Sequence, residues 1–254
     1  MAQKTATEAV LEGFRLLADE RAPGRVGLSG SLRCLRAQGM EALALPQSDP
    51  PDEGSMVAFA TGHAMEAAVI EAMEMGGLAV TDRQRHVNLM IGTDCADVWP
   101  ERRCAVLVPH GPGGDLTDAP LRPCGALVPA GSVAGHIDGR LGGGRVLLDC
   151  KAYSEFGFKK LHEHGAPDDS YFGKGQRAQL VAYMAALKED GKSVEYSKIV
   201  AVNKAAKKAD PGSRRGNLPA VCEVDVDFDE VTALAVVEFW REVAAQKRAG
   251  EVIA

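Results

Sequence analysis

About the first 80 residues carry apolar positions at helical spacing. Apolar residues recur there every three or four positions, as in helices that bury one face. The turn-rich segment PQSDPPDEG at 46–54 interrupts the pattern, and Gly76-Gly77 ends it. Ser29 or Ser31 is the expected N-cap of the second helix. The pattern predicts helices over residues 5–20, 31–45 and 62–77.

The middle of the chain carries short β-like runs separated by glycine and proline clusters. Gly142-Gly143-Gly144 joins two of these runs and predicts a hairpin within residues 135–153. A helical pattern returns at 175–188 and again from Asp229, the expected cap, to Ala249. Strands are expected over residues 85–91, 104–109, 131–138, 144–152, 195–202 and 219–227.

This order of elements predicts an α/β fold with a central mixed β-sheet flanked by helices. The chain shows no internal repeat and no break in composition. We therefore expect one domain over residues 1–254, whose N-terminal portion, about residues 1–80, is helical.

Composition and charge exclude several classes of protein. Hydrophobic residues make up 46% of the 254 residues, which excludes a mainly disordered chain. No apolar run approaches the ~18 residues of a membrane helix, and MAQKTATEAVLEGF contains no apolar signal core. Neither a membrane span nor an export signal is therefore expected. The net charge is −6, so any contact with nucleic acid must come from local basic patches.

The cysteines are scattered and form no Cys-x-x-Cys pair. This spacing gives little support to a zinc ribbon or knuckle, and a metal site built from distant residues is the less favoured alternative. Without an export signal, the cysteines indicate reduced thiols in a cytoplasm. The six are Cys34, Cys95, Cys104, Cys124, Cys150 and Cys222.

The segment GHIDGRLGGGRVLLDCKAY at 135–153 is the most informative part of the chain. Side chains alternate along a strand, so Asp149 and Lys151 point to one face and Cys150 to the other. Apolar residues directly precede Asp149, and a bound cation would offset the cost of burying its charge. A hairpin would bring Asp138 close to Asp149. An Asp-Gly turn and a surface ion pair are the plainer interpretation of the same residues.

This segment resembles the core motif of the PD-(D/E)XK nuclease superfamily, in which an Asp and a short hairpin precede Asp/Glu-x-Lys. GHIDG and VLLDCK are similar to the RecB and lambda-exonuclease-like branch, which includes phage-type exonucleases. Three further pieces match that branch: GHAME at 62–66, Gln179-x-x-x-Tyr183, and the early helix SLRCLRAQGM at 31–40. The resemblance covers about residues 29–245, with Ile137 where the superfamily name implies Pro.

The resemblance implies a restriction-endonuclease-like core and a metal-dependent DNA nuclease, with an exonuclease favoured over an endonuclease. It implies a role in DNA recombination, DNA repair or phage DNA metabolism, in the cytoplasm of a bacterial or phage-infected cell. The implied metal is Mg²⁺ or Mn²⁺, which prefers hard oxygen ligands. Some relatives hold an iron–sulfur cluster with three C-terminal cysteines, but only Cys222 lies in that region, so no cluster is expected.

The resemblance also assigns roles to individual residues. Lys151 would position water and offset charge on the scissile phosphate. Gln179 and Tyr183, which share a helical face, would orient the site and the bound strand. The implied metal ligands are Glu66, Asp138, Asp149 and the carbonyl of Cys150.

The choice of Glu66 as the third acidic ligand also rests on helical geometry. At 100° per residue, Glu66 lies at the margin of the expected buried stripe, and Glu71 and Glu74 face solvent. His63 is the alternative, as a ligand or as a residue behind the ligands. The expected stripe consists of Met65, Ala68, Val69, Ala72 and Met73.

A local excess of basic residues predicts a contact with the DNA backbone. Residues 198–215 hold six basic residues and one acidic residue, a local net charge of +5. A plain solvated loop is the alternative. Ser154, Lys159 and Lys160 follow the core strand and are further candidates for phosphate contacts. The expected DNA-binding residues are Lys204, Lys207, Lys208, Arg214, Arg215, Lys159 and Lys160.

Two other functions stay open on the sequence. One is a non-catalytic DNA- or protein-binding member of the same fold, and the other is an acidic metal-binding module without nuclease activity. A binding module does not require the full set of acids with Lys151, which favours the nuclease. Beyond DNA, the resemblance allows a homo-oligomer and a recombination or single-strand-binding partner, and no membrane partner is expected.

Overall fold

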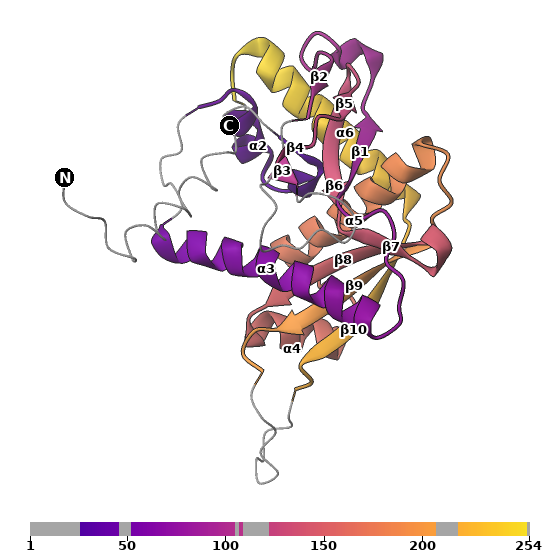
Figure 1. Cartoon of the computed structure of the whole chain (residues 1–254). Helices are drawn as coiled ribbons and strands as arrows, with labels where there is room; N and C mark the ends of the chain where they lie inside the picture. Colours follow the sequence, from indigo (N-terminus) through magenta and orange to yellow (C-terminus); the bar gives the residue numbers. More distant parts are fainter. Residues whose placement is uncertain (1–25, 46–51, 105–106, 109–121, 207–217, 253–254) are drawn as a thin grey trace, which may run out of the picture.

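A computed structural model describes residues 26–45, 52–104, 107–108, 122–206 and 218–252 of the chain (Figure 1). The helix expected over residues 5–20 lies outside these ranges. The described part combines helices with a mixed sheet, which confirms the α/β prediction. None of its helices has both the length and the apolar character that crossing a membrane requires.

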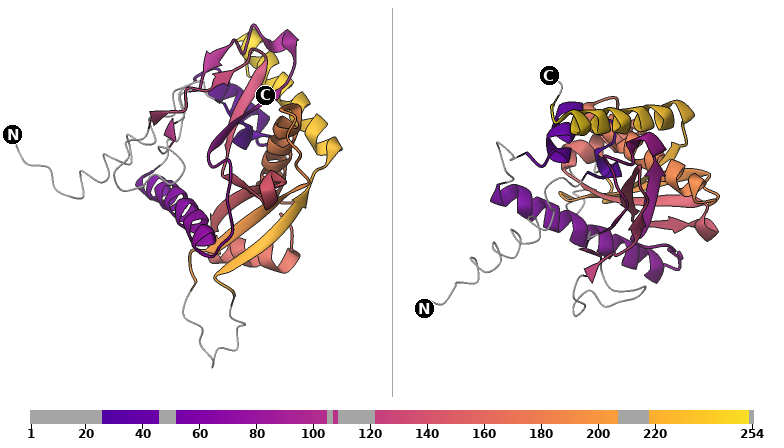
Figure 2. Two further views of the ribbon diagram at one scale, coloured as in Figure 1. Left: turned by 45° about the vertical axis from the view of Figure 1, so that its right-hand side comes forward. Right: turned by 90° about the horizontal axis from the view of Figure 1, so that it is seen from above.

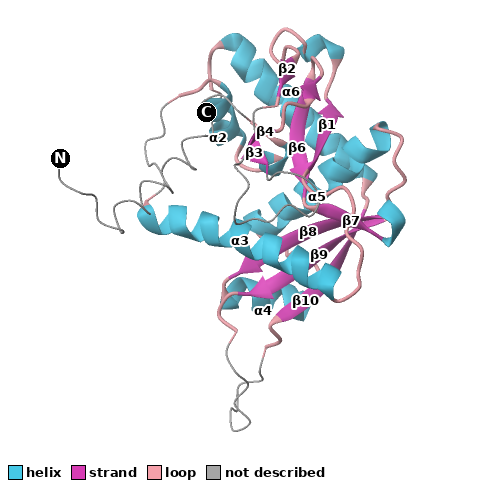
Figure 3. Ribbon diagram, in the orientation of Figure 1, coloured by secondary structure: helices cyan, strands magenta, loops and turns pink. Residues whose placement is uncertain are grey.

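A four-stranded sheet stands at the centre, in the order β10-β9-β8-β7 (Figure 3). β8 pairs in parallel with β9, and the two outer pairs are antiparallel, so the sheet is mixed as expected. Buried apolar side chains on both faces of β8 and β9 explain their central place. The strands are β7 (Gly139–Leu141), β8 (Val146–Tyr153), β9 (Tyr196–Asn203) and β10 (Val221–Asp227).

Helices cover both faces of this sheet (Figure 2). On one face, Ile70 of α3 (Glu53–Met75) packs in a small core with Leu148 and Cys150. On the other face, Leu147 belongs to the main core. That core also includes residues of α4 (Glu155–His164), α5 (Tyr171–Glu189) and α6 (Glu230–Ala249). The side chains of β8 therefore alternate between two apolar layers.

A second group of strands extends from the sheet. β1 (Arg85–Met90) pairs antiparallel with β6 (Ser132–Ile137). Two short pairs follow: β2 (Arg102–Arg103) with β5 (Leu127–Val128), and β3 (Leu107–Val108) with β4 (Arg122–Pro123). The strand expected over 104–109 is thus limited to the two residues of β3 among those described.

Two helix starts differ from the prediction. α2 (Leu35–Ala42) follows the short 3-10 turn η1 (Leu28–Gly30) and has Cys34 at its N-cap position, without a side-chain cap. Ser31 instead accepts a hydrogen bond from the buried Trp240 Nε1, at 3.0 Å, so the expected serine cap is wrong. α3 begins at Glu53 because Asp52 accepts the Ser55 N–H, although 52–54 was expected to be loop.

The sequence pattern missed one helix and located another correctly. α4 begins where the Ser154 side chain accepts the Gly157 N–H. Only Phe158 and Leu161 are buried in its ten residues, too few to produce a helical period. The last helix starts at its expected cap, Asp229, which accepts two backbone N–H groups.

Candidate active site

The candidate site lies where the hairpin partner of β8 ends. β7 pairs with β8 only as far as Gly139 and Leu148, so the next positions along the two strands are Asp138 and Asp149. The hairpin prediction is confirmed for β7 and β8. It is wrong for the strand expected over 131–138, because β6 pairs with β1 instead. Beyond Gly139 and Leu148, β7 no longer pairs with β8.

A backbone group of Cys150 faces the Asp138 side chain. The Cys150 N–H donates a hydrogen bond to Asp138 Oδ2 at 2.7 Å. The N–H and C=O groups of one strand residue point to the same side, so the Cys150 carbonyl points to the same side of β8 as its N–H. The Cys150 side chain packs against α3, on the face opposite to Asp149, as the alternation predicted.

Asp149 and Lys151 lie on one face of β8 and form an ion pair. Lys151 Nζ donates to Asp149 Oδ1 at 2.8 Å, and only 4% of the Asp149 side chain is exposed. Burial of one carboxylate at this level requires a partner. The interpretation of this pair as a surface ion pair is therefore wrong.

Glu66 reaches the site from α3. The helix packs on the sheet through Val69, Ile70 and Met73, three, four and seven residues beyond Glu66. Glu66 therefore points towards the sheet, where its charge and side-chain hydrogen bonding help to raise the pKa of the Asp138 carboxyl.

The expected buried stripe of α3 is wrong in part. Ala68 and Ala72 are exposed, whereas Ile70, which is outside the expected stripe, is buried. The stripe is thus rotated towards Glu66, because a run of alanines does not distinguish one helix face from another. Glu71 and Glu74 are exposed as expected, and Glu74 forms an ion pair with Arg83.

Burial and mutual repulsion perturb the charges of the cluster. Burial, with the charges of Asp149 and Glu66, raises the pKa of Asp138 well above its usual range, although Lys151 opposes the shift. Burial also raises the pKa of Asp149. Burial alone would lower the pKa of Lys151, but the charges of Asp149 and Asp138 outweigh it and raise this pKa. The cluster thus holds three acids against a single positive charge, the Lys151 ammonium group.

Gln84 holds Glu66 in place and was missed by the sequence pattern. Its Nε2 donates to Glu66 Oε1 at 3.0 Å, and its N–H lies 3.4 Å from the carbonyl oxygen of Asp138. Gln84 and Asp82 both have positive φ, 50° and 53°, which is rare for residues other than glycine. Such backbone conformations gather at functional sites, but the letters TDRQ of this turn carry no sign of them.

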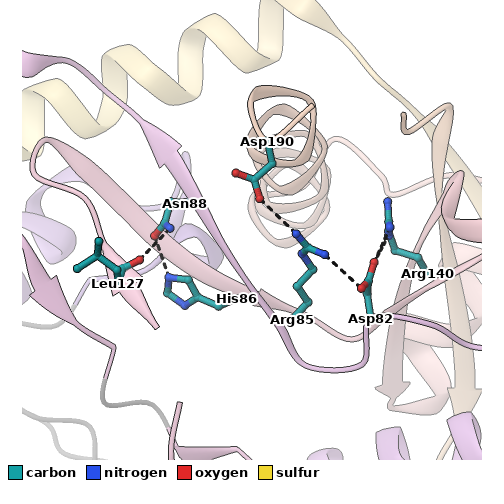
Figure 4. A network of polar contacts seen from close by, with 7 residues as sticks. All are labelled: Asp82, Arg85, His86, Asn88, Leu127, Arg140 and Asp190. Carbon is teal, nitrogen blue, oxygen red and sulfur yellow. Dashed lines mark hydrogen bonds and ion pairs between the residues drawn. The ribbon is translucent and has the colours of Figure 1, made fainter. Parts of the chain in front are cut away.

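Ion pairs fix the turn that carries Gln84 (Figure 4). Arg140 Nε donates to Asp82 Oδ2 at 2.6 Å, and Arg85 donates to Asp82 Oδ1 at 3.2 Å. Thr81 and Arg140 also exchange backbone hydrogen bonds of 2.9 and 2.8 Å. The connection after α3 is therefore tied to β7, the strand that follows Asp138.

Gln179 and Tyr183 lie on the buried face of α5, as expected. Gln179 Nε2 donates to the Tyr183 hydroxyl at 3.2 Å. Burial raises the pKa of Tyr183, Lys151 lowers it, and the charges of Asp138 and Asp149 raise it further. Its hydroxyl is thus within electrostatic range of the cluster. Gly135 makes room for the ring, since a Cβ there would lie 2.5 Å from Tyr183 Cε1.

The ion pairs of the described candidate DNA-binding residues are made with acids outside this cluster. Lys159 is exposed and pairs with Glu163, while Lys160 pairs with Asp168. Both lie on α4, for which Ser154 serves as the N-cap. Lys198 pairs with Glu223 and Asp225, and Lys204 is exposed just after β9. Lys207, Lys208, Arg214 and Arg215 lie outside the described residues.

The alternative ligand, His63, lies on α3 three residues before Glu66. The described contacts bring Glu66, Asp138, Asp149 and Lys151 together, with Tyr183 close by. Their donor set fits Mg²⁺ or Mn²⁺, because it consists of carboxylate oxygens with the Cys150 carbonyl beside them. A divalent cation would also relieve the repulsion that raises the carboxyl pKa values.

Comparison with known proteins gives structural neighbours only. No protein-family model matches the chain, and no curated protein matches its sequence. An alkaline exonuclease from Laribacter hongkongensis (LHK-Exo) is similar at 14% identity, over 94% of this chain and 95% of that chain, with a TM-score of 0.44. LHK-Exo in complex with dAMP is similar at 15% identity, over 89% and 91% of the two chains, with a TM-score of 0.43.

Proposed function

We propose that this chain is a metal-dependent DNA nuclease, with an exonuclease favoured over an endonuclease. One observation carries the proposal: Glu66, Asp138 and Asp149 converge with Lys151 where β7 leaves the edge of β8. Such a set is costly in the absence of a ligand, because the three acids repel one another in a buried place. A non-catalytic protein of the same fold has no need to retain it.

Glu66, Asp138, Asp149 and the Cys150 carbonyl would hold the Mg²⁺ or Mn²⁺ ion. When bound, the ion acts as a Lewis acid on the phosphate and lowers the pKa of water. The carboxylates orient it, and Gln84 keeps Glu66 in the required position through its hydrogen bond of 3.0 Å.

Lys151 supplies the positive charge of the chain at the reacting phosphate. Its raised pKa keeps it an ammonium group at neutral pH, and its bond to Asp149 fixes its direction. From there it can donate to a phosphate oxygen and offset the negative charge that grows in the transition state. Tyr183, held by Gln179, adds a hydroxyl on the same side.

DNA is the proposed partner, in recombination, repair or phage DNA metabolism. The acids of the cluster repel a polyanion until a cation neutralises them, which makes metal and DNA binding cooperative. The basic segment that includes Lys204 would then contact the backbone away from the reacting phosphate. A homo-oligomer, a recombination partner and a single domain over the whole chain are further parts of the proposal.

Digestion of DNA by the full chain tests the proposal. Linear and covalently closed circular DNA are incubated with the protein in Mg²⁺, in Mn²⁺ and in EDTA. We expect linear DNA to shorten from its ends only with metal, while circular DNA persists. Cleavage of the circle with metal would replace the exonuclease by an endonuclease. Equal cleavage in EDTA, or intact DNA under every condition, would contradict a metal-dependent nuclease.

A further inference from the structure

A second cluster of ligand-type side chains lies outside the carboxylate site. One potential ligand atom from each of four residues lies within 4.8 Å of the others. Two of the residues are cysteines and two are histidines, and all but the buried Cys104 are partly buried. The four residues are His86, Cys104, Cys124 and His136.

Strand pairing brings the two histidines together. His86 on β1 and His136 on β6 are direct partners in the antiparallel register, and their ring centroids lie 5.2 Å apart. Directly opposed side chains point to the same face of a ladder. The two imidazoles therefore form one side of the cluster.

Backbone hydrogen bonds bring the two cysteines to the other side. The Cys104 N–H donates to the Ala126 carbonyl at 2.8 Å, and the Gly125 N–H donates to the Cys104 carbonyl at 2.8 Å. These bonds close the β2–β5 pair and place Cys124 next to Cys104. Cys104 Sγ lies 3.9 Å from His136 Nε2. Neither cysteine forms a disulfide within the described part of the chain.

The hydrogen bonds of His86 leave one ring nitrogen available (Figure 4). Asn88 Nδ2 donates to the Leu127 carbonyl at 3.2 Å, so Asn88 Oδ1 faces the imidazole and accepts from His86 Nε2 at 2.8 Å. The proton is therefore on Nε2, and Nδ1 keeps a lone pair. His86 Nδ1 is buried and has no hydrogen-bond partner among the described residues. A metal-binding histidine characteristically has its other nitrogen fixed in this way.

We propose that His86, Cys104, Cys124 and His136 bind one Zn²⁺ ion. Two thiolates and two neutral imidazoles in a tetrahedron are typical of structural zinc sites. Zinc bonds of 2.0–2.3 Å place neighbouring ligand atoms about 3.3–3.8 Å apart, so the cluster must contract by only about 1 Å. The four protein ligands leave no open position, so the site stabilises structure and performs no hydrolysis.

The sulfur and nitrogen ligands separate this site from the carboxylate cluster, which suits a hard cation. The zinc ion would fasten the β2–β5 pair to the β1–β6 ladder. His136 stands two residues before Asp138, so the same ion would stabilise the strand that leads to the candidate active site. The zinc proposal does not depend on nuclease activity.

Metal content of the full chain tests the site. The protein, without an affinity tag that binds metal, is purified without chelators from zinc-supplemented cells. Its zinc content is measured by inductively coupled plasma mass spectrometry. We expect about one zinc per chain, lost in Cys104→Ser and in His136→Ala. The matched controls Cys222→Ser and His164→Ala, outside the cluster, should keep it. Equal zinc in the ligand and control variants would overturn the proposal.

A measurement on the unmodified chain keeps the test valid if the ligand variants do not fold. Zinc is removed under reducing conditions and replaced with Co²⁺, which absorbs visible light strongly when tetrahedral and bound by thiolates. We expect these absorption bands, and their loss when Zn²⁺ is added. A chain that holds far less than one zinc and develops no cobalt–thiolate bands would overturn the site. A Cys104–Cys124 disulfide in freshly reduced and desalted protein would do so as well.

Discussion

Replacing Lys151 with Met should destabilise the metal-free protein strongly. Lys151 is the ammonium group that the contacts place against Asp149 and near Asp138. Methionine keeps much of the volume of the side chain and removes only the charge and the hydrogen bond. The variant therefore leaves a 4% exposed carboxylate without its cation.

Removing one partner of a buried ion pair typically costs about 3–5 kcal/mol. Lys151 is itself 30% exposed, so the lower part of that range applies. For a chain of this size, each kcal/mol shifts Tm by about 2–4 °C, which gives a decrease of at least roughly 6 °C. The exposed pair of Lys159 with Glu163 is worth only about 0.3–0.5 kcal/mol, so Lys159→Met is the matched control.

The loss should depend on pH in a defined direction. The pKa values of Asp138 and Asp149 are raised in the folded state, so the stability linked to their protons is present at low pH. It is lost as pH rises from about 3.8 through the raised values. Without Lys151 these values rise further. The Tm difference between Lys151→Met and the unmodified chain should therefore shrink between pH 8 and pH 5.

Thermal melts in EDTA at both pH values, with circular dichroism at each end point, measure this effect. A loss of less than about 1 kcal/mol in the free energy of unfolding at pH 8, or a loss equal to that of Lys159→Met, would refute the buried charge cluster. A Tm difference between Lys151→Met and the unmodified chain that grows from pH 8 to pH 5 would refute the assigned direction of the carboxyl pKa shifts.

Other variants test single contacts. Gln84→Gly should be more stable than Gln84→Ala by about 1 kcal/mol in the free energy of unfolding, since glycine adopts positive φ without strain. Equal stability of the two variants would refute that strain. Both should cleave DNA more slowly. Ser31→Ala should cost about 1–3 kcal/mol, because the buried Trp240 Nε1 loses its acceptor; an unchanged denaturant midpoint would contradict that bond. Glu66→Gln should abolish cleavage and keep the fold, whereas His63→Ala should reduce the rate modestly; the reverse pattern would make His63 the ligand. Alanine at the five basic positions should weaken DNA binding and make the affinity less dependent on salt concentration. An unchanged dependence of the affinity on salt would mean that the segment is a plain solvated loop. These positions are Lys204, Lys207, Lys208, Arg214 and Arg215.

Local patterns identified the elements whose signal lies within a few residues. The apolar run before Asp149 predicted β8, and alternation placed Asp149 and Lys151 on one face. Asp229 marked the start of α6 because capping is a local property. The same locality explains the missed α4, whose stability comes from two buried residues that contact distant parts of the chain.

Features that depend on the meeting of distant segments could not be obtained this way. Alanines on α3 placed Glu66 only at the margin of the expected stripe, whereas the packing of Ile70 against β8 brings Glu66 towards the sheet. The left-handed backbone of Gln84 is imposed by the ion pairs around Asp82. The His86–His136 pair depends on the β1–β6 register. The spacing of the cysteines along the chain therefore could not predict the cluster that these histidines form with Cys104 and Cys124.

The most direct test of the central claim joins cleavage to metal binding in the same variants. Asp138→Asn and Asp149→Asn each remove one charge from the cluster with little change in shape. Glu71→Gln, on the exposed side of α3, is the control. Cleavage of linear DNA and the rise of Tm with Mg²⁺ are measured for all three. We predict that both asparagine variants lose cleavage and most of the Mg²⁺-dependent rise in Tm, and that Glu71→Gln keeps both. Normal cleavage by either asparagine variant would contradict the claim that these carboxylates hold the metal that cuts DNA.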